Sequence, residues 1–102
     1  MTHPDEQVVN EVVQRLVSAL PIEKIILFGS RARGEAKQDS DFDFLVIMDT
    51  DLSPLKRNVE IRKVGRVKGY PMDFLVRTPE EMANGFIMQK EIAAEGVVVY
   101  ER

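Results

Sequence analysis

The chain has 102 residues, of which 44% are apolar and 30% are charged, and this length and composition predict a single domain over residues 1–102. Its 14 basic and 17 acidic side chains give a net charge of −3, which argues against a strongly basic nucleic-acid-binding protein. Because the chain has no cysteine and only one histidine, His3, disulfide scaffolds, cysteine-based zinc sites and cysteine nucleophiles are excluded, and a histidine-dependent triad is not expected.

The sequence also lacks the features of a membrane or secreted protein. Its longest apolar run, Phe44 to Met48, is far shorter than the roughly 20 residues that a membrane span requires. The N-terminus has no basic region followed by an apolar stretch, so it does not resemble a signal peptide. We therefore expect a cytoplasmic protein with no membrane segment.

The first predicted elements are a helix and a strand. Between Pro4 and Leu20, apolar residues recur at helical spacing, which predicts an amphipathic helix that ends before Pro21. Ile22 to Phe28 is short and rich in β-branched residues, which predicts a buried strand that ends before Gly29.

A short helical segment and a second strand follow. Ser30 to Gly34 predicts one or two helical turns, and Glu35 to Ser40 predicts a polar loop. Asp41 to Met48 alternates between polar and apolar residues and then becomes wholly apolar, which predicts a central strand.

The next predicted helix begins after Ser53, which is a suitable N-cap residue and is followed by proline at the first helical position. The helix is expected to extend from Pro54 to about Val64. We expect its apolar residues Leu55, Val59 and Ile61 to face the core.

The remaining elements are a strand, a helix and a final strand. Met72 to Arg77 predicts the third strand, and the capping-box pattern of Thr78 to Glu81 predicts the start of a helix with an interruption near Asn84. Gly96 is placed to end that helical region, and Val97 to Tyr100 predicts the closing strand. The alternation of helix and strand predicts a small α/β (α+β) sheet domain.

The segment directly after the first strand suggests an anion site. Gly29 permits a tight turn and a close approach by a ligand, and Ser30 offers a hydroxyl at the start of a helix. Arg31 and Arg33 would strengthen the attraction for phosphate. The alternative is an ordinary strand-to-helix turn with solvated arginines.

Carboxylates near the starts of two strands suggest a metal site. Asp41 and Asp43 are two residues apart and should project from one face of their strand, whereas Phe42 packs on the other side together with the next phenylalanine. Two neighbouring carboxylates repel each other and can jointly hold Mg²⁺, although they could instead pair with arginine or face solvent. If the second and third strands are neighbours, Asp73 would join them, which gives the side chains needed for two-metal phosphoryl or nucleotidyl transfer.

Together these residues resemble the DNA polymerase β-type nucleotidyltransferase superfamily. Gly29 and Ser30 are followed, eleven residues after Ser30, by the Asp-Phe-Asp triplet that begins at Asp41, and a later strand carries Asp73. The resemblance extends from about Ile22 to Glu101. Within the superfamily, the chain is similar to the minimal MNT-type members, which are usually partnered with a HEPN-domain protein in prokaryotic toxin–antitoxin modules.

The resemblance implies a nucleotidyltransferase fold, with a small mixed β-sheet flanked by helices and the active site at the open edge of the sheet. It implies that Asp41 and Asp43 hold two Mg²⁺ ions, and that Asp73 binds the catalytic ion and accepts the proton of the attacking hydroxyl. The implied reaction is in-line attack on the α-phosphate of a nucleoside triphosphate, expected to be ATP, with release of pyrophosphate.

The same resemblance assigns the nucleotide phosphates to the glycine–serine turn. It implies that Gly29 and Ser30 contact the β- and γ-phosphates. It also implies that Arg31 or Arg33 neutralises charge on the triphosphate, and the choice between the two arginines stays open.

The resemblance further predicts a partner protein. Larger members of the superfamily carry an additional domain that binds the acceptor, whereas this chain ends directly after the part that resembles the catalytic core. We therefore expect a partner to supply the acceptor, and the resemblance points to a HEPN toxin that receives AMP on a tyrosine. The alternative is a non-catalytic antitoxin that neutralises its HEPN toxin by binding alone. The acidic balance and the lack of a template-binding domain disfavour polymerase-like activity on nucleic acid.

Two surface features have more than one interpretation. The segment from Lys56 to Lys68 contains six basic residues and one acid, Glu60, and is either a solvated face or a surface that contacts a partner or steers the nucleotide. Apolar residues near the end of the chain are expected either in the core or on an oligomer face; they are Met82, Phe86, Ile87, Met88 and Ile92.

Overall fold

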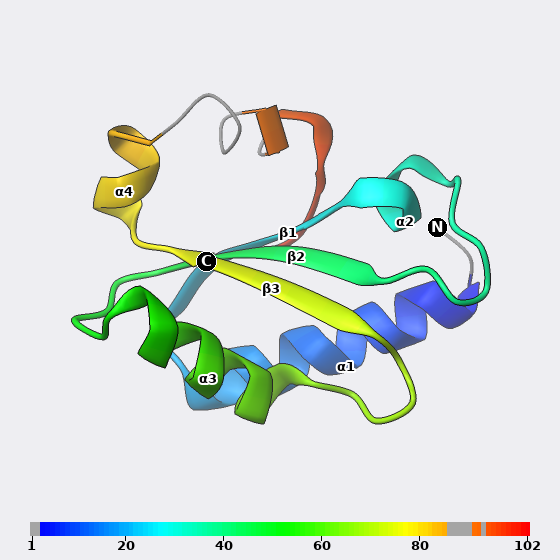
Figure 1. The fold of residues 1–102 in the computed structure, drawn as a ribbon, viewed down its shortest axis with the longest axis horizontal. Helices are drawn as coiled ribbons and strands as arrows, with labels where there is room; N and C mark the ends of the chain where they lie inside the picture. The colour runs from blue at the N-terminus through cyan, green and yellow to red at the C-terminus, as the bar shows by residue number, and fades with distance from the viewer. Residues whose placement is uncertain (1–2, 86–90, 93) are drawn as a thin grey trace.

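The computed structural model describes residues 3–85, 91–92 and 94–102, and its helices and strands alternate along the chain (Figure 1). The elements are α1 (His3–Ala19), β1 (Ile22–Phe28), α2 (Gly29–Arg33), β2 (Phe42–Met48), α3 (Pro54–Gly65), β3 (Met72–Arg77), α4 (Pro79–Ala83) and β4 (Val97–Glu101). The predicted alternation of helix and strand is therefore confirmed, and most of the predicted ends lie within one residue of those observed.

The strands form one mixed sheet in the order β3-β2-β1-β4. β1 pairs antiparallel with β2 and with β4, whereas β2 and β3 run parallel. Parallel neighbours need a crossover connection, which α3 supplies between β2 and β3. The mixed sheet and the central position of β2 agree with the sequence prediction, and the parallel register places Asp43 opposite Asp73.

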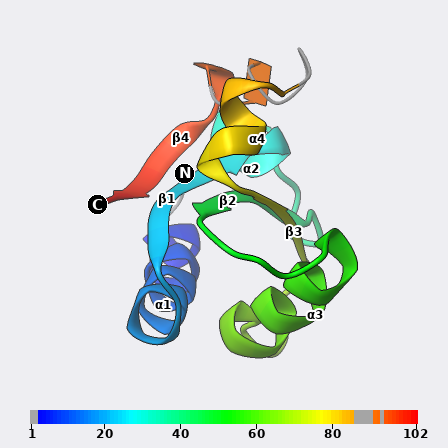
Figure 2. The same ribbon diagram turned by 90° about the vertical axis from the view of Figure 1, so that its left-hand side faces the viewer.

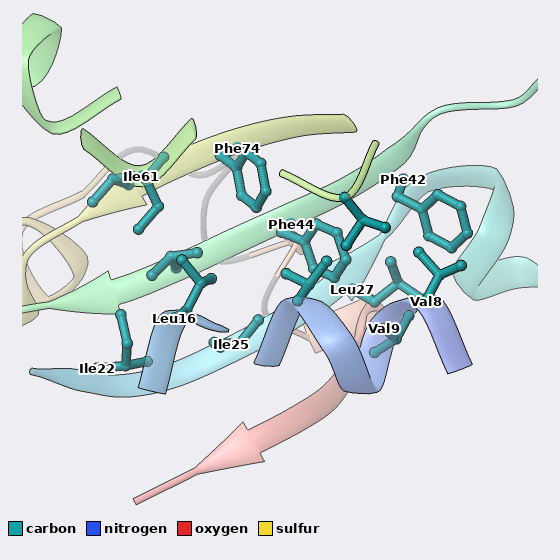
Figure 3. Packing of buried hydrophobic residues seen from close by; sticks show 14 of the residues in the cluster. Val8, Val9, Leu16, Ile22, Ile25, Leu27, Phe42, Phe44, Ile61 and Phe74 are labelled. Atoms are coloured by element: carbon teal, nitrogen blue, oxygen red, sulfur yellow. The ribbon is translucent and has the colours of Figure 1, made fainter. Parts of the chain in front are cut away.

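Helices α1 and α3 cover one face of the sheet (Figures 1 and 2), and the main hydrophobic core lies between them and the strands. Val12 and Leu16 of α1 are four residues apart, so they lie on the same side of the helix, and both are fully buried. They belong to the same core cluster as Phe44 and Phe74, whose rings stack with centroids 5.4 Å apart (Figure 3).

The prediction for the inner face of α3 is wrong for two of its three residues. Leu55 and Val59 are 76% and 54% exposed, and only Ile61 is buried. The helix instead buries positions four residues apart, with Arg57 before Ile61 and Gly65 after it. Because Gly65 has no side chain, α3 approaches α1 closely at this position, and a Cβ atom there would lie 2.8 Å from a methyl group of Leu16.

The opposite face of the sheet carries a second apolar layer. Ile26 and Leu45 are fully buried there, because successive residues of a strand point to opposite faces. Gly96 lies against this layer, and any side chain at that position would overlap Ile26. α4 lies on the same side of the sheet (Figure 1), as does the site described below.

The predicted capping box and interruption of the fourth helix are both confirmed. The Thr78 hydroxyl accepts a hydrogen bond from the backbone N–H of Glu81, and the Glu81 carboxylate accepts one from the backbone N–H of Thr78. The hydrogen bond from the Thr78 N–H lowers the pKa of the Glu81 carboxyl, and the Arg57 guanidinium lowers it further. The same carboxylate lies 2.7 Å from a guanidinium nitrogen of Arg57, which ties α4 to α3.

The helix ends at Ala83, and residues 91–92 and 94–95 are again helical, directly before Gly96. Met82 and Ile92 are half-buried. Phe86 to Met88, which the sequence predicts in the core or on an oligomer face, lie outside the described residues. In the part of the chain that the structure describes, no helix has both the length and the apolar character needed to cross a membrane.

Candidate active site

The structure brings Asp41, Asp43 and Asp73 together at one end of the sheet. Asp43 is the second residue of β2 and Asp73 the second residue of β3, and the parallel register makes them direct neighbours. Asp41 precedes β2 by one residue. One carboxylate oxygen from each of the three lies within 4.8 Å of the others, close enough for all three to hold one metal ion.

The phenylalanines between and after these acids fix the direction of the carboxylates. Phe42 and Phe44 are fully buried on the core side of β2, and their rings stack with centroids 6.4 Å apart. Since side chains alternate along a strand, burial of these rings turns Asp41 and Asp43 to the other face. The driving force that positions the acids is therefore the burial of their aromatic neighbours.

The electrostatics of the cluster centre on Asp43, which is half-buried, whereas Asp41 and Asp73 are exposed. Burial raises the pKa of the Asp43 carboxyl above its ordinary value of 3.8, and repulsion from Asp73 and then Asp41 raises it further. The Arg33 guanidinium opposes this rise in part. Three convergent carboxylates that repel one another, without a full complement of basic partners, are a donor set suited to a hard divalent cation such as Mg²⁺.

Gly29 brings the chain directly against the acid cluster. Its φ angle of +76° belongs to the left-handed region that favours glycine. A Cβ atom on Gly29 would overlap a carboxylate oxygen of Asp43, so a larger residue would displace that acid. Ser30 follows in the first turn of α2, and Phe28, which precedes this helix, has no side-chain acceptor to cap the first N–H groups.

The two arginines of α2 have different surroundings. Arg31 is 7% exposed, and its guanidinium lies 4.2 Å from the ring centre of Phe42. It donates hydrogen bonds to a carboxylate oxygen of Asp5 at 2.9 Å and to the carbonyl oxygens of Gln38 and Ser40. Arg31 therefore holds the start of α1 and the loop before β2, and its guanidinium is directed into the protein.

Arg33, in contrast, is exposed and lies at the site. It lines a pocket together with Gly29 and with Glu91 and Glu95 from the region before β4. Its nearest ion pair is with Glu35, at 3.3 Å. Of the two arginines that the sequence left open, Arg33 is the one whose charge reaches the acid cluster.

A residue that sequence reasoning did not assign to the site is Arg62 of α3. One of its guanidinium nitrogens lies 3.4 Å from a carboxylate oxygen of Asp73. Arg62 and Arg66 line a second pocket, of about 220 Å³, together with Asp41 and Asp73. The only sequence signal for this contact is the basic segment from Lys56 to Lys68, in which Arg57 is instead buried.

Comparisons with known proteins agree with this geometry. The model of the family described as "Nucleotidyltransferase domain" matches residues 7–98. A protein of Methanocaldococcus jannaschii, named "Putative protein adenylyltransferase", is 45% identical over 49 residues, which are 46% of this chain and 49% of that protein. The chain thus spans about half the length of this curated relative.

Two solved structures share the fold. One, described as a "putative nucleotidyltransferase" from Sulfolobus solfataricus, has a TM-score of 0.62 and 22% identity, covering 96% of this chain and 78% of the other. The other, described as a toxin–antitoxin with AMP-PNP, has a TM-score of 0.65 and 15% identity, covering 92% and 73% of the two chains. Similarity at this level of identity establishes the arrangement of helices and strands.

Proposed function

The chain belongs to the nucleotidyltransferase domain family, and we propose that it transfers AMP from ATP to a hydroxyl group of a partner protein. The observation that carries the proposal is the convergence of Asp41, Asp43 and Asp73 beside the Gly29–Ser30 turn. The name of the Methanocaldococcus jannaschii relative supports a protein as acceptor, and the structural neighbour described as a toxin–antitoxin supports a toxin as partner.

In this proposal the acid cluster binds two Mg²⁺ ions. Asp41 and Asp43 would hold both ions, and Asp73 would hold the catalytic one. When bound, Mg²⁺ neutralises the charge of the triphosphate and stabilises the oxygens that enter and leave the α-phosphorus. The mutual repulsion of the carboxylates is relieved at the same time, so the repulsion that raises the pKa of Asp43 favours metal binding.

The glycine–serine turn holds the other end of the nucleotide. The N–H groups at the start of α2 and the Ser30 hydroxyl donate to the β- and γ-phosphates, and Gly29 leaves room for them beside Asp43. Arg33 adds a positive charge from the solvent side. Arg31 contributes indirectly, because its contacts with the Gln38 and Ser40 carbonyls fix the loop that leads to Asp41.

The transfer step exchanges one bond to phosphorus for another. The acceptor hydroxyl oxygen forms a bond to the α-phosphorus, and the bond from that phosphorus to the oxygen bridging the α- and β-phosphates breaks. Pyrophosphate leaves with the electron pair of the broken bond. The hydroxyl proton passes to the carboxylate of Asp73, which is exposed and therefore accessible to an incoming acceptor.

The acceptor in this proposal is a HEPN-domain toxin encoded by the gene next to the one for this chain. Mixing the two proteins with ATP and Mg²⁺ should add the mass of one or more AMP groups to the toxin, as measured by intact-protein mass spectrometry. Asp43→Asn should abolish the addition, because it removes a central carboxylate of the cluster. An unmodified toxin after reaction with folded wild-type protein would contradict the proposal.

The second candidate is neutralisation by binding alone, and the structural neighbour described as a toxin–antitoxin gives it support. The same variant separates the two functions. If Asp43→Asn protects cells from the toxin as well as the wild type does, binding is sufficient and transfer is not the neutralising step. If protection is lost while the complex still forms, transfer is required.

A further inference from the structure

The outward side of α3 carries a continuous stripe that the fold leaves uncovered. Leu55, Val59 and Arg62 are spaced four and three residues apart, so they lie one above another along the helix, and Arg66 follows directly after its last residue as the C-cap. Leu55 and Val59, at 76% and 54%, are the most exposed of the large hydrophobic residues in the described part of the chain. We call these four residues the α3 stripe.

The α3 stripe runs from an apolar end to a cationic end, and the cationic end reaches the acid cluster. Arg62 contacts Asp73 at 3.4 Å, and Arg62 and Arg66 line the pocket that also contains Asp41. Figure 1 shows α3 lying along β3, with the C-terminal end of the helix toward the end of the sheet where β3 begins. A ligand lying along the stripe would therefore end at the proposed catalytic carboxylates.

The charge of this surface is uncompensated at several positions. Within the described residues, the side chains of Arg66, Lys63 and the neighbouring Lys56 make no hydrogen bond or ion pair. The Arg62–Asp73 pair is itself solvent-exposed, so it contributes little to stability and is easily exchanged for another partner. The surface thus offers positive charge and apolar area side by side.

We infer that the α3 stripe binds the acceptor-bearing segment of the partner protein, a segment with apolar side chains next to acidic ones. This inference rests on the proposed function, since the partner is the protein that receives AMP. Apolar side chains of the segment cover Leu55 and Val59, and its carboxylates pair with Arg62 and Arg66. The acceptor hydroxyl is thereby held beside Asp73, on the side of the cluster away from the Gly29 turn.

The chemistry of the stripe favours a protein segment over a nucleic acid. Phosphate groups would gain contacts with the arginines, but the apolar side chains of Leu55 and Val59 have no donor or charge that could bind them. An acidic and apolar polypeptide complements both halves of the stripe.

Affinity measurements with four variants test the inference. The probe is the HEPN-domain protein encoded beside the chain, titrated calorimetrically against the wild type and each variant. Leu55→Glu and Arg66→Glu should each raise Kd at least about tenfold, because one places charge in the apolar half and the other reverses charge in the cationic half. Lys37→Glu, a charge reversal at an exposed site away from α3, should leave Kd within about twofold.

Asp43→Asn is the fourth variant, and it separates the inference from the proposed function. It should bind the partner as the wild type does but should transfer no AMP. If Leu55→Glu and Arg66→Glu weaken binding but the wild type transfers no AMP to the partner, the docking surface is supported and the proposed AMP transfer is refuted. Thermal unfolding of each variant tests whether the substitution leaves the fold intact.

Several results would overturn the inference. One is a partner affinity that neither Leu55→Glu nor Arg66→Glu changes, and another is the absence of any complex with the wild type. Self-association of the chain that Leu55→Glu abolishes would assign the stripe to a second copy instead. RNA or DNA binding that depends on Arg66 and is indifferent to Leu55 would assign it to phosphate recognition.

Discussion

Asp43 is the residue at which the proposed function and the stability of the fold oppose each other. Its raised pKa means that the folded state favours the protonated carboxyl. Well below pH 3.8, the ordinary pKa, the Asp43 carboxyl is protonated in both the folded and the unfolded state, so it costs no stability. As the pH rises through the higher pKa of the folded protein, the carboxyl ionises in the folded state and the protein loses stability. Without metal, the fold carries this cost wherever the Asp43 carboxyl is ionised.

Asp43→Asn should consequently raise the unfolding temperature of the metal-free protein at pH 7. For a chain of this size, 1 kcal/mol of added stability corresponds to about 4–8 °C. Differential scanning fluorimetry in EDTA measures the shift, and Mg²⁺ should then stabilise the wild type but not the variant. Asp41→Asn, at an exposed position, should give a smaller shift in EDTA. Lower stability of Asp43→Asn than of the wild type would contradict this account of the cluster.

At Gly29 the absence of a Cβ atom leaves room for the Asp43 carboxylate, and Gly34 provides a matched control. Both glycines have positive φ angles, +76° and +75°, so alanine strains the backbone equally at either position, by about 1–2 kcal/mol. Only at Gly29 would the added Cβ overlap the Asp43 carboxylate, since nothing lies within 4 Å at Gly34.

Gly29→Ala should therefore lower AMP transfer at least about tenfold, a loss of about 1.4 kcal/mol in transition-state stabilisation. Gly34→Ala should lose stability but retain transfer at a temperature where it is folded. Initial rates of label incorporation from ATP give the comparison. Equal rates in the two variants would show that contact with Asp43 is unimportant.

At the scale of elements, α2 separates a structural arginine from a functional one. The Arg31–Asp5 pair is buried, with side chains 8% and 11% exposed, and removing one partner of such a pair costs about 3–5 kcal/mol. Arg31→Ala should therefore destabilise the protein by about 3 kcal/mol in urea denaturation. Arg33→Ala, at an exposed position, should change stability by less than about 0.5 kcal/mol and should instead weaken ATP binding. The reverse pattern would mean that the roles of the two arginines are exchanged.

α3 shows the limit of periodicity as a guide to burial. The sequence pattern assigned Leu55 and Val59 to the core because they are apolar, whereas the helix buries Arg57 and Gly65 on either side of Ile61. Arg57 can be buried because Glu81 and the Leu52 carbonyl accept its hydrogen bonds. Those partners belong to other elements, so no local pattern could identify them.

For the molecule as a whole, the order of elements was predictable because each carries a local signal. Pro21 and Gly29 mark the ends of the first helix and strand, and Ser53 and Thr78 cap the helices that follow them. The three aspartates lie close together because β2 and β3 are parallel neighbours. The sequence did not predict this pairing, so the cluster could be predicted only on the assumption that the two strands are adjacent.

Long-range contacts were beyond local reasoning. The buried pair of Arg31 and Asp5 joins residues 26 positions apart, and each acts as an ordinary polar residue in its own segment. The contact between Arg62 and Asp73 similarly depends on the packing of α3 along β3. Sequence therefore indicated which residues carry the chemistry, and the fold distinguished those that face the site from those that support it.

The central claim is that the chain moves the α-phosphate of ATP, with its nucleoside, onto a partner protein. The most direct measurement is a parallel reaction of the chain and its HEPN-domain partner with ATP labelled at the α- or the γ-phosphate. Our account predicts Mg²⁺-dependent incorporation of the α-label only, and none with Asp43→Asn. Incorporation of the γ-label would indicate phosphoryl transfer, and no incorporation of either label by folded wild-type protein would contradict the claim.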